Sequence, residues 1–200
     1  MLIEIKNRYT KNVIISGKYG SLGECLTKNR GSDLSYSNLS YSNLSHSNLS
    51  HSDLRGSNLS YSDLSYSNLS YSNLSHSDLG YSDLRNSDLR GSNLRGSDLR
   101  GSDLRFSYLP SPTMLLLCHW NTVSDNLCTE LMRYDAENHP RPELFEDWAN
   151  GDICPYGRGF SRCAIFHEKK ELYIAGTAKT ARELVLLLFR EKNIKFSEGI

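Results

Sequence analysis

The sequence predicts a mainly β protein, in which a solenoid of about four square coils lies between an N-terminal β-hairpin cap and a C-terminal α+β domain. Three features of the 200-residue chain lead to this fold class. A leucine recurs every five residues from Leu34 to Leu109, sixteen times without a gap; a serine stands two positions before each leucine; Asp or Asn stands directly before each one, except at Tyr108. A period of five fits neither an α-helix nor a β-strand, whereas short unbroken periods are typical of solenoids.

Residues 1–30 are expected to cap the first coil, because an open solenoid end would expose leucines and unpaired strand edges. Residues 2–5 and 13–15 have the pattern of two short strands joined by a polar turn over residues 7–12. Ser21 and Glu24 have capping-box spacing for a helical turn. This segment carries six basic and two acidic side chains, so it is either a solvated basic face or an anion-binding rim.

Residues 31–110 are expected to form the solenoid. A five-residue unit is too short to bury its own leucine, so it relies on stacked neighbours. If each unit forms one side of a square, four units return the chain to its starting side, and leucines twenty residues apart stack. The Ser, Asn, Asp and Gly content also suits a disordered linker, but the unbroken leucines argue against disorder.

The repeated unit S-[DN]-L-x-x resembles the pentapeptide-repeat family, whose pattern is A-[DN]-L-x-x. The resemblance implies a right-handed quadrilateral β-helix in which the leucine and the small residue point inward and the other three positions face solvent. Serine replaces the usual alanine in this chain, so each buried hydroxyl is expected to need a backbone carbonyl partner or to cost about 1–3 kcal/mol. The core carried over from the family comprises Leu34, Leu39, Leu44, Leu49, Leu54, Leu59, Leu64, Leu69, Leu74, Leu79, Leu84, Leu89, Leu94, Leu99, Leu104 and Leu109.

The two positions after each leucine divide the solenoid. They are mostly Ser followed by Tyr or His in the first half, and mostly Arg followed by Gly or Asn in the second. At a period of twenty, an aromatic ladder and an aspartate column are expected, and five consecutive arginines are expected to surround the rod as a basic girdle. These candidate partner-binding residues are Tyr41, Tyr61 and Tyr81, then Asp63, Asp83 and Asp103, and Arg85, Arg90, Arg95, Arg100 and Arg105.

Residues 111–200 are expected to form the α+β domain, since Pro110 and Pro112 stop the coil. Helices are predicted from Ser124 to about residue 134, over residues 143–150, and over residues 181–191 behind a capping box of Thr180 and Glu183. Residues 164–167 and 171–174 are predicted as a hairpin. The third helix is apolar almost all round, which requires burial in the domain's own core or in a homodimer interface.

Composition argues against export, membrane association and direct nucleic-acid binding. The 23 basic side chains balance the 23 acidic ones, and the five cysteines are scattered, which suits a reducing compartment. Residues 1–9 contain no apolar signal core, and the apolar run over residues 114–118 is too short to span a bilayer. The expected location is cytoplasmic.

Catalytic and metal-binding motifs are missing from the C-terminal part of the sequence. Cysteine and histidine occur there without C-x2-C or H-x3-H spacing, and no G-x-S-x-G, P-loop, H-E-x-x-H or G-x-G-x-x-G pattern occurs. Neither a cofactor nor a metal is therefore expected. Two polar and aromatic clusters, residues 133–135 and 146–148, are candidates for a ligand or partner cleft.

The preferred interpretation is a non-enzymatic cytoplasmic scaffold that binds a protein partner through the β-helix surface. The resemblance implies one alternative, a DNA mimic that binds a type II topoisomerase, DNA gyrase or topoisomerase IV. The rod supports it poorly, because it carries six basic against eight acidic groups. A second alternative makes the C-terminal domain an enzyme or ligand sensor and the solenoid a spacer.

Overall fold

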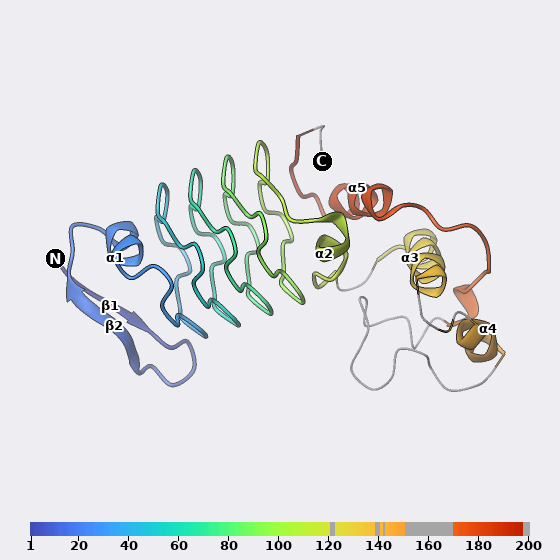
Figure 1. Cartoon of the computed structure of the whole chain (residues 1–200), viewed down its shortest axis with the longest axis horizontal. Helices are drawn as coiled ribbons and strands as arrows, with labels where there is room; N and C mark the ends of the chain where they lie inside the picture. The colour runs from blue at the N-terminus through green and yellow to red at the C-terminus, as the bar shows by residue number, and fades with distance from the viewer. Residues whose placement is uncertain (121–122, 139–140, 142, 151–169, 198–200) are drawn as a thin grey trace.

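The computed structural model describes residues 1–120, 123–138, 141, 143–150 and 170–197. A β-helix solenoid forms the middle of an elongated molecule (Figure 1). Strands β1 (Leu2–Lys6) and β2 (Val13–Lys18) and helix α1 (Leu22–Lys28) cover one end. Beyond the other end lie α2 (Pro112–Leu116), α3 (Asp125–Glu137), α4 (Glu143–Ala149), the short 3-10 helix η1 (Lys170–Leu172) and α5 (Ala181–Glu191).

Each coil of the solenoid takes twenty residues. Parallel bridges join residues twenty apart, from Asp33 with Asp53 up to Asp88 with Tyr108. Within each bridge the leucine N–H donates to a carbonyl nineteen residues later, as from Leu54 to Asn73 at 2.8 Å. We number the sides by their leucines: side one begins with Leu34, side two with Leu39, side three with Leu44 and side four with Leu49.

A left-handed residue turns the chain at each corner. The second residue after the leucine has a positive φ, as in Tyr61 at 57° and Asn86 at 56°. Asparagine and glycine adopt this conformation at low cost, whereas tyrosine and histidine do so at some cost. Gly101 has an additional role, because a Cβ there would lie 2.6 Å from the Tyr81 ring of the coil below. The glycines of the second half thus let a ring of the preceding coil lie flat on the main chain.

The leucines form the solenoid core. The fifteen from Leu34 to Leu104 are buried. The expectation of full burial is wrong for Leu109, which is only partly buried. It occupies side four of the last coil, where no further coil covers it.

The serines two positions before each leucine are also buried, except Ser32, Ser42 and Ser107, which are half-buried. Most donate to the carbonyl of the preceding leucine, as from Ser62 Oγ to Leu59 O and from Ser72 Oγ to Leu69 O, both at 2.6 Å. The expected carbonyl partner is therefore present. Ser37 Oγ and Ser47 Oγ are exceptions near the N-terminal end, because both are buried without a hydrogen-bond partner.

Ser37→Ala is expected to stabilise the protein by about 1 kcal/mol, because it removes a buried hydroxyl that makes no hydrogen bond. The matched control is Ser72→Ala, which removes a hydroxyl that is bonded to Leu69 O. Chemical denaturation should show a higher midpoint for the first variant and an unchanged or lower midpoint for the second. Equal shifts would show that the hydroxyl bond contributes nothing at either position.

The N-terminal cap pairs with the first coil as well as covering it. Strands β1 and β2 are antiparallel, and Ile3 and Ile5 are buried toward the leucines. The main chain then continues the ladder, because Asn38 N donates to Lys6 O at 2.9 Å. Helix α1, N-capped by Ser21, buries Cys25 and Leu26.

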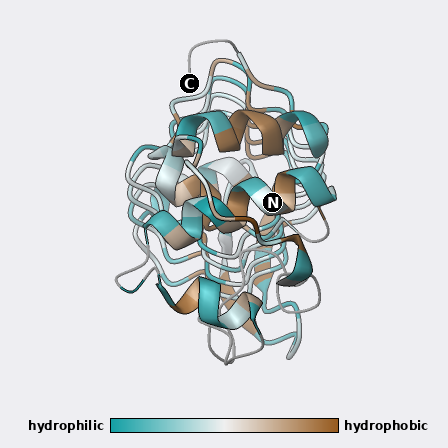
Figure 2. Ribbon diagram, turned by 90° about the vertical axis from the view of Figure 1, so that its right-hand side faces the viewer, coloured by the Kyte–Doolittle hydropathy of each residue, from teal (hydrophilic) through white to brown (hydrophobic). Residues whose placement is uncertain are grey.

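The C-terminal end is closed by α2 and α5, which pack on each other. Pro112, expected only to stop the coil, also starts α2, with Ser111 as the N-cap. Helix α5 has the expected capping box of Thr180 and Glu183. Viewed along the rod from this end, these helices lie in front of the stacked coils (Figure 2).

The α+β description of residues 111–200 is not seen in the described part, which contains helices and no named strand. Residues 164–167 of the expected hairpin lie outside the described residues. The second expected strand begins instead with η1, because α3 side chains bind its carbonyls: Thr129 Oγ1 donates to Leu172 O at 3.2 Å, and Arg133 Nε to Ile174 O at 2.9 Å. No helix among the described residues is long and apolar enough to cross a membrane.

Candidate interaction surface

Three tyrosines stack along the corner that follows side two. Tyr41 and Tyr61 have ring centroids 5.0 Å apart and parallel planes; Tyr61 and Tyr81 are 5.1 Å apart with planes 8° apart. The coil period places the rings at the spacing of neighbouring strands. We call Tyr41, Tyr61 and Tyr81 the tyrosine ladder. Its rings remain 75%, 50% and 59% exposed.

Two other corners carry shorter mixed stacks. His46 lies 5.0 Å from Tyr66, and His51 lies 5.3 Å from Tyr71, measured between ring centroids. These pairs were not singled out from the sequence, although the same twenty-residue spacing identifies them. The tyrosine ladder therefore belongs to a wider aromatic surface and is its longest run of tyrosines.

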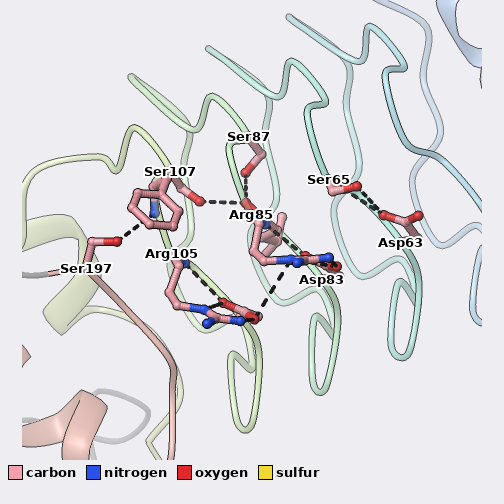
Figure 3. Close-up of polar contacts among 11 residues, drawn as sticks. Asp63, Ser65, Asp83, Arg85, Ser87, Arg105, Ser107 and Ser197 are labelled. Atoms are coloured by element: carbon pink, nitrogen blue, oxygen red, sulfur yellow. Dashed lines mark hydrogen bonds and ion pairs between the residues drawn. The ribbon is translucent and has the colours of Figure 1, made fainter.

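The arginines of the rod are held by aspartates two residues earlier in the same unit. The side chains of Arg85 and Asp83 approach to 2.5 Å (Figure 3). Those of Arg100 and Asp98 approach to the same distance, and Arg85 also reaches Asp103 of the next coil at 4.0 Å. Arg55, Arg90 and Arg105 form the same pair with Asp53, Asp88 and Asp103. The expected basic girdle is consequently a ring of mostly paired charges. Arg95 differs, because Asn93 precedes its leucine.

The acidic and amide side chains fix the turn of each unit. Asp83 Oδ1 accepts the N–H of Arg85 at 3.0 Å, and Asn58 Oδ1 accepts the N–H of Ser60 at the same distance. Asp and Asn serve equally well in this bond, which is an Asx turn. Where serine follows the leucine, its hydroxyl donates to the same oxygen, as between Ser65 and Asp63 (Figure 3). The Asp/Asn position is thus explained by turn formation without any role in displaying charge.

The hydrogen bond from Arg85 holds the pKa of Asp83 below its ordinary value, and the bond from Arg90 does the same for Asp88. A lowered folded-state pKa means that these pairs stabilise the fold above the unfolded-state pKa, near pH 4, and that this contribution is lost as the pH falls further. The double variant Asp83→Asn/Asp88→Asn has neither carboxylate to protonate. We therefore expect its melting temperature to fall less than that of the wild type between about pH 5 and pH 3, the range around the ordinary pKa of aspartate.

Asp63→Asn is the matched control for loss of a carboxylate at this position, because Asp63 lies on the same side as Asp83 and is bonded to Ser65 in place of an arginine. At neutral pH it should lower the melting temperature less than the double variant does, because no ion pair is lost. Identical acid sensitivity of the wild type and the double variant would contradict a stabilising role for the pairs.

A cleft of about 480 Å³ lies among α3, α4 and the segment after η1. Arg133 and Glu146, from the two clusters singled out in the sequence, meet in its lining, whereas Asp135 and Trp148 are buried. Arg133 is already bonded to Glu130 and to Ile174 O. The other lining side chains include Glu137, Glu143, Tyr173 and Thr177.

The cysteines of the described part are buried and lack the surroundings of a nucleophile. Burial raises the pKa of the Cys118 thiol to about 12, which keeps it protonated at neutral pH. No group of three or more His, Cys, Asp or Glu side chains that could hold a metal ion occurs in the residues that the structure describes. His139, Cys154, Cys163 and His167 lie outside those residues.

Comparison with known proteins identifies the repeat. The family profile for pentapeptide repeats (8 copies) matches residues 32–70 and 67–105. A pentapeptide repeat protein from the cyanobacterium Cyanothece 51142 is 32% identical over 40% of this chain and 54% of its own, with a TM-score of 0.39. One from Nostoc Pcc 7120 is 30% identical over 44% of this chain and 81% of its own, with a TM-score of 0.32.

A third protein with this repeat, from the Arabidopsis thaliana thylakoid lumen, is 16% identical over 86% of this chain and 95% of its own, with a TM-score of 0.27. No curated protein matches the chain significantly. The chain spans about half the length of the Cyanothece protein, so the similarity concerns the repeat. Its unbroken repeat and the profile match over residues 32–105 show that the chain belongs to the pentapeptide-repeat family.

Proposed function

We propose that this protein is a non-enzymatic cytoplasmic scaffold whose solenoid surface binds a protein partner. The observation that carries the proposal is the tyrosine ladder, three stacked rings that stay at least half exposed. Tyrosine is among the residues that contribute most to binding at protein interfaces. The proposed solenoid is right-handed and makes about four coils.

The ladder is organised before any partner binds. Each ring is fixed by its neighbour in the stack and by a main chain held in the bridges between coils. A partner therefore orders few side chains on binding, which lowers the entropic cost of association. The ladder provides a rigid apolar stripe with a hydroxyl at the end of each ring.

The charges of the rod favour a protein partner over nucleic acid. Nucleic-acid binding depends on cationic groups that neutralise phosphates. Five arginines of this rod are instead paired with aspartates two residues earlier. A partner that covered the girdle would meet an ion pair at four of its five arginines.

The DNA-mimic alternative, with DNA gyrase or topoisomerase IV as partner, needs a row of free negative charge. The same ion pairs oppose it, because they neutralise Asp83, Asp88, Asp98 and Asp103 along the second half of the rod. We expect micromolar protein to leave the supercoiling activity of purified gyrase unchanged. Inhibition or protection of gyrase would instead favour the mimic.

The enzyme or ligand-sensor alternative rests on the cleft beside α3. The arginine that lines this cleft is bonded to Glu130 and Ile174 O, and the remaining charged lining is acidic. This arrangement includes no nucleophile paired with a base among the described residues. The scaffold remains the function that the geometry supports best.

The scaffold proposal is tested by replacing the ladder with the residue that this chain uses at an equivalent left-handed corner, Asn86. The triple variant Tyr41→Asn/Tyr61→Asn/Tyr81→Asn should fold and should capture at least about tenfold less partner from an extract of the source cells, as expected from losing aromatic contact residues. Quantitative mass spectrometry of the captured proteins measures the difference.

Tyr71→Asn is the matched control, because Tyr71 is a similarly exposed ring on another corner. It should retain the captured partner. If every protein captured by the wild type is captured equally by the folded triple variant, the ladder is not the binding surface.

A further inference from the structure

Later parts of the chain bond to the last coil on sides two and three and at the corner after side one. At that corner Gly96 N donates to Leu117 O at 2.7 Å, and on side two His119 N donates to Ser97 O at 2.8 Å. On side three, Lys195 N donates to Ser102 O at 3.1 Å, and Leu104 N donates to Lys195 O at 2.7 Å. Segments 117–119 and 192–197 therefore act as partial strands of a further coil.

Side four of the same coil has no such bond within the described residues. The N–H of Leu94 and the C=O of Ser92 on side one also lack a backbone partner there, but Leu94 is fully buried, whereas Leu109 is only partly buried. One coil lower, Leu89 N donates to Tyr108 O at 2.7 Å, and Tyr108 N donates to Ser87 O at 2.9 Å. The groups that would continue this pattern are the N–H of Leu109 and the C=O of Ser107, and neither has a backbone partner among the described residues. We call Ser107–Pro110 the open edge. An unpaired edge of this kind is a template for another strand.

An apolar groove lies beside the open edge. Its volume is about 520 Å³, and its lining includes Leu104, Phe106, Tyr108, Leu109, Pro110 and Pro112. Phe106 and Tyr108 are 68% and 61% exposed, and the Arg90 guanidinium lies 4.8 Å from the centre of the Tyr108 ring.

The sequence of the last coil departs from the repeat at this edge. Phe106 and Tyr108 occupy the positions that are Asn86 and Asp88 one coil lower. Two half-buried polar positions have thus been replaced by exposed aromatic ones beside the side whose leucine is only partly buried. The coincidence of unpaired backbone groups with added apolar surface favours a docking site over an incidental surface gap.

We propose that the open edge binds a short extended peptide segment of a protein partner, which adds to side four as one more parallel strand. One peptide residue would complete the bridge, by accepting from the N–H of Leu109 and donating to the C=O of Ser107. The next side chain would lie over Leu109, so it is apolar. Addition of a strand to an exposed sheet edge is a general mode of peptide recognition.

The size of the site favours a peptide over a second copy of the chain. Each side of the solenoid contributes a single bridge, and the groove holds about 520 Å³. A stable dimer usually buries about 1,200–2,000 Å². The open edge lies on side four, away from the tyrosine ladder at the corner after side two, so the two proposals stand or fall separately.

The test uses the full-length chain and a fluorescently labelled hexapeptide with blocked ends that copies residues 66–71. In that sequence Asn68 occupies side four, where its N–H donates to Ser47 O and its C=O accepts from Leu49 N. Fluorescence anisotropy should show saturable binding with a dissociation constant of about 1 mM or tighter. Methylating the peptide nitrogen that corresponds to Asn68 should weaken binding roughly tenfold, because one bridge hydrogen bond is lost.

The protein variant is Phe106→Asn/Tyr108→Asp, which gives the last coil the residues of the coil below. It should bind the peptide at least about fivefold more weakly, because the apolar rim is gone. The matched control, Tyr66→Asn, lies on the same corner as Phe106 and should bind normally. Hydrogen exchange should show slower exchange at the Leu109 amide when the unmethylated peptide is present.

Three outcomes would overturn the proposal: no binding at millimolar peptide, equal binding of the methylated peptide, or equal binding by the folded Phe106→Asn/Tyr108→Asp variant. Dimerisation of the wild type that this variant abolishes, without any peptide binding, would assign the open edge to a second copy and would also overturn it.

Discussion

Leu74→Asp is expected to unfold the middle of the solenoid. Leu74 is fully buried on side one of the third coil, with Leu54 in the coil below it and Leu94 in the coil above it. The variant removes about 2 kcal/mol of apolar burial and places a carboxylate where no cation or donor can reach it, at a further cost of several kcal/mol. Chemical denaturation followed by circular dichroism should show loss of the native transition or a decrease of about 4 kcal/mol or more in the free energy of unfolding.

Leu2→Asp is the control, because Leu2 is an exposed leucine of β1. It should change stability by about 0.5 kcal/mol or less. A Leu74→Asp variant with native melting behaviour would refute the inward orientation of the repeat leucine.

Phe189→Ala is expected to destabilise the C-terminal end by about 3–5 kcal/mol. The ring is fully buried in α5, 6.2 Å from the Trp120 ring and 5.5 Å from the Phe196 ring between centroids. Its loss leaves a cavity under the segment that pairs with the last coil through Lys195. Thermal denaturation and hydrogen exchange should show opening of the last coil before the first.

Phe106→Ala removes the same side chain from an exposed corner and is the control for this substitution. Its stability should stay within about 0.5 kcal/mol of the wild type. If the two variants were equally stable, α5 would not be holding the C-terminal end of the rod.

The solenoid could be predicted from sequence because its contacts repeat at a constant separation. Once four units make a coil, every bridge, leucine column and corner stack follows from adding twenty, as for Tyr41, Tyr61 and Tyr81. The N-terminal strands and the capping box of Thr180 and Glu183 were predictable for a related reason: alternation and short-range side-chain bonds are local. At Ser21 only the N-cap bond formed, because the Glu24 carboxylate accepts from the N–H of Gly20 instead.

The pairing of the arginines with aspartates, and the contacts made by the C-terminal segments, were not predictable in the same way. The arginines looked like a basic girdle in the sequence, but the main-chain turn brings four of its five members onto the aspartate two residues before each of them. The prediction of a strand at residues 171–174 is wrong, because side chains of α3 bind the carbonyls of Leu172 and Ile174.

The sequence by itself determined the coil, its core and the corner residues, since one period specifies all of them. The tertiary structure decided where the coil stops being paired. Segments 117–119 and 192–197 bond to sides two and three of the last coil and to the corner after side one, and leave Leu109 at the open edge. That outcome depends on contacts between segments far apart in the chain and without a shared period, so the path of the folded chain alone sets it.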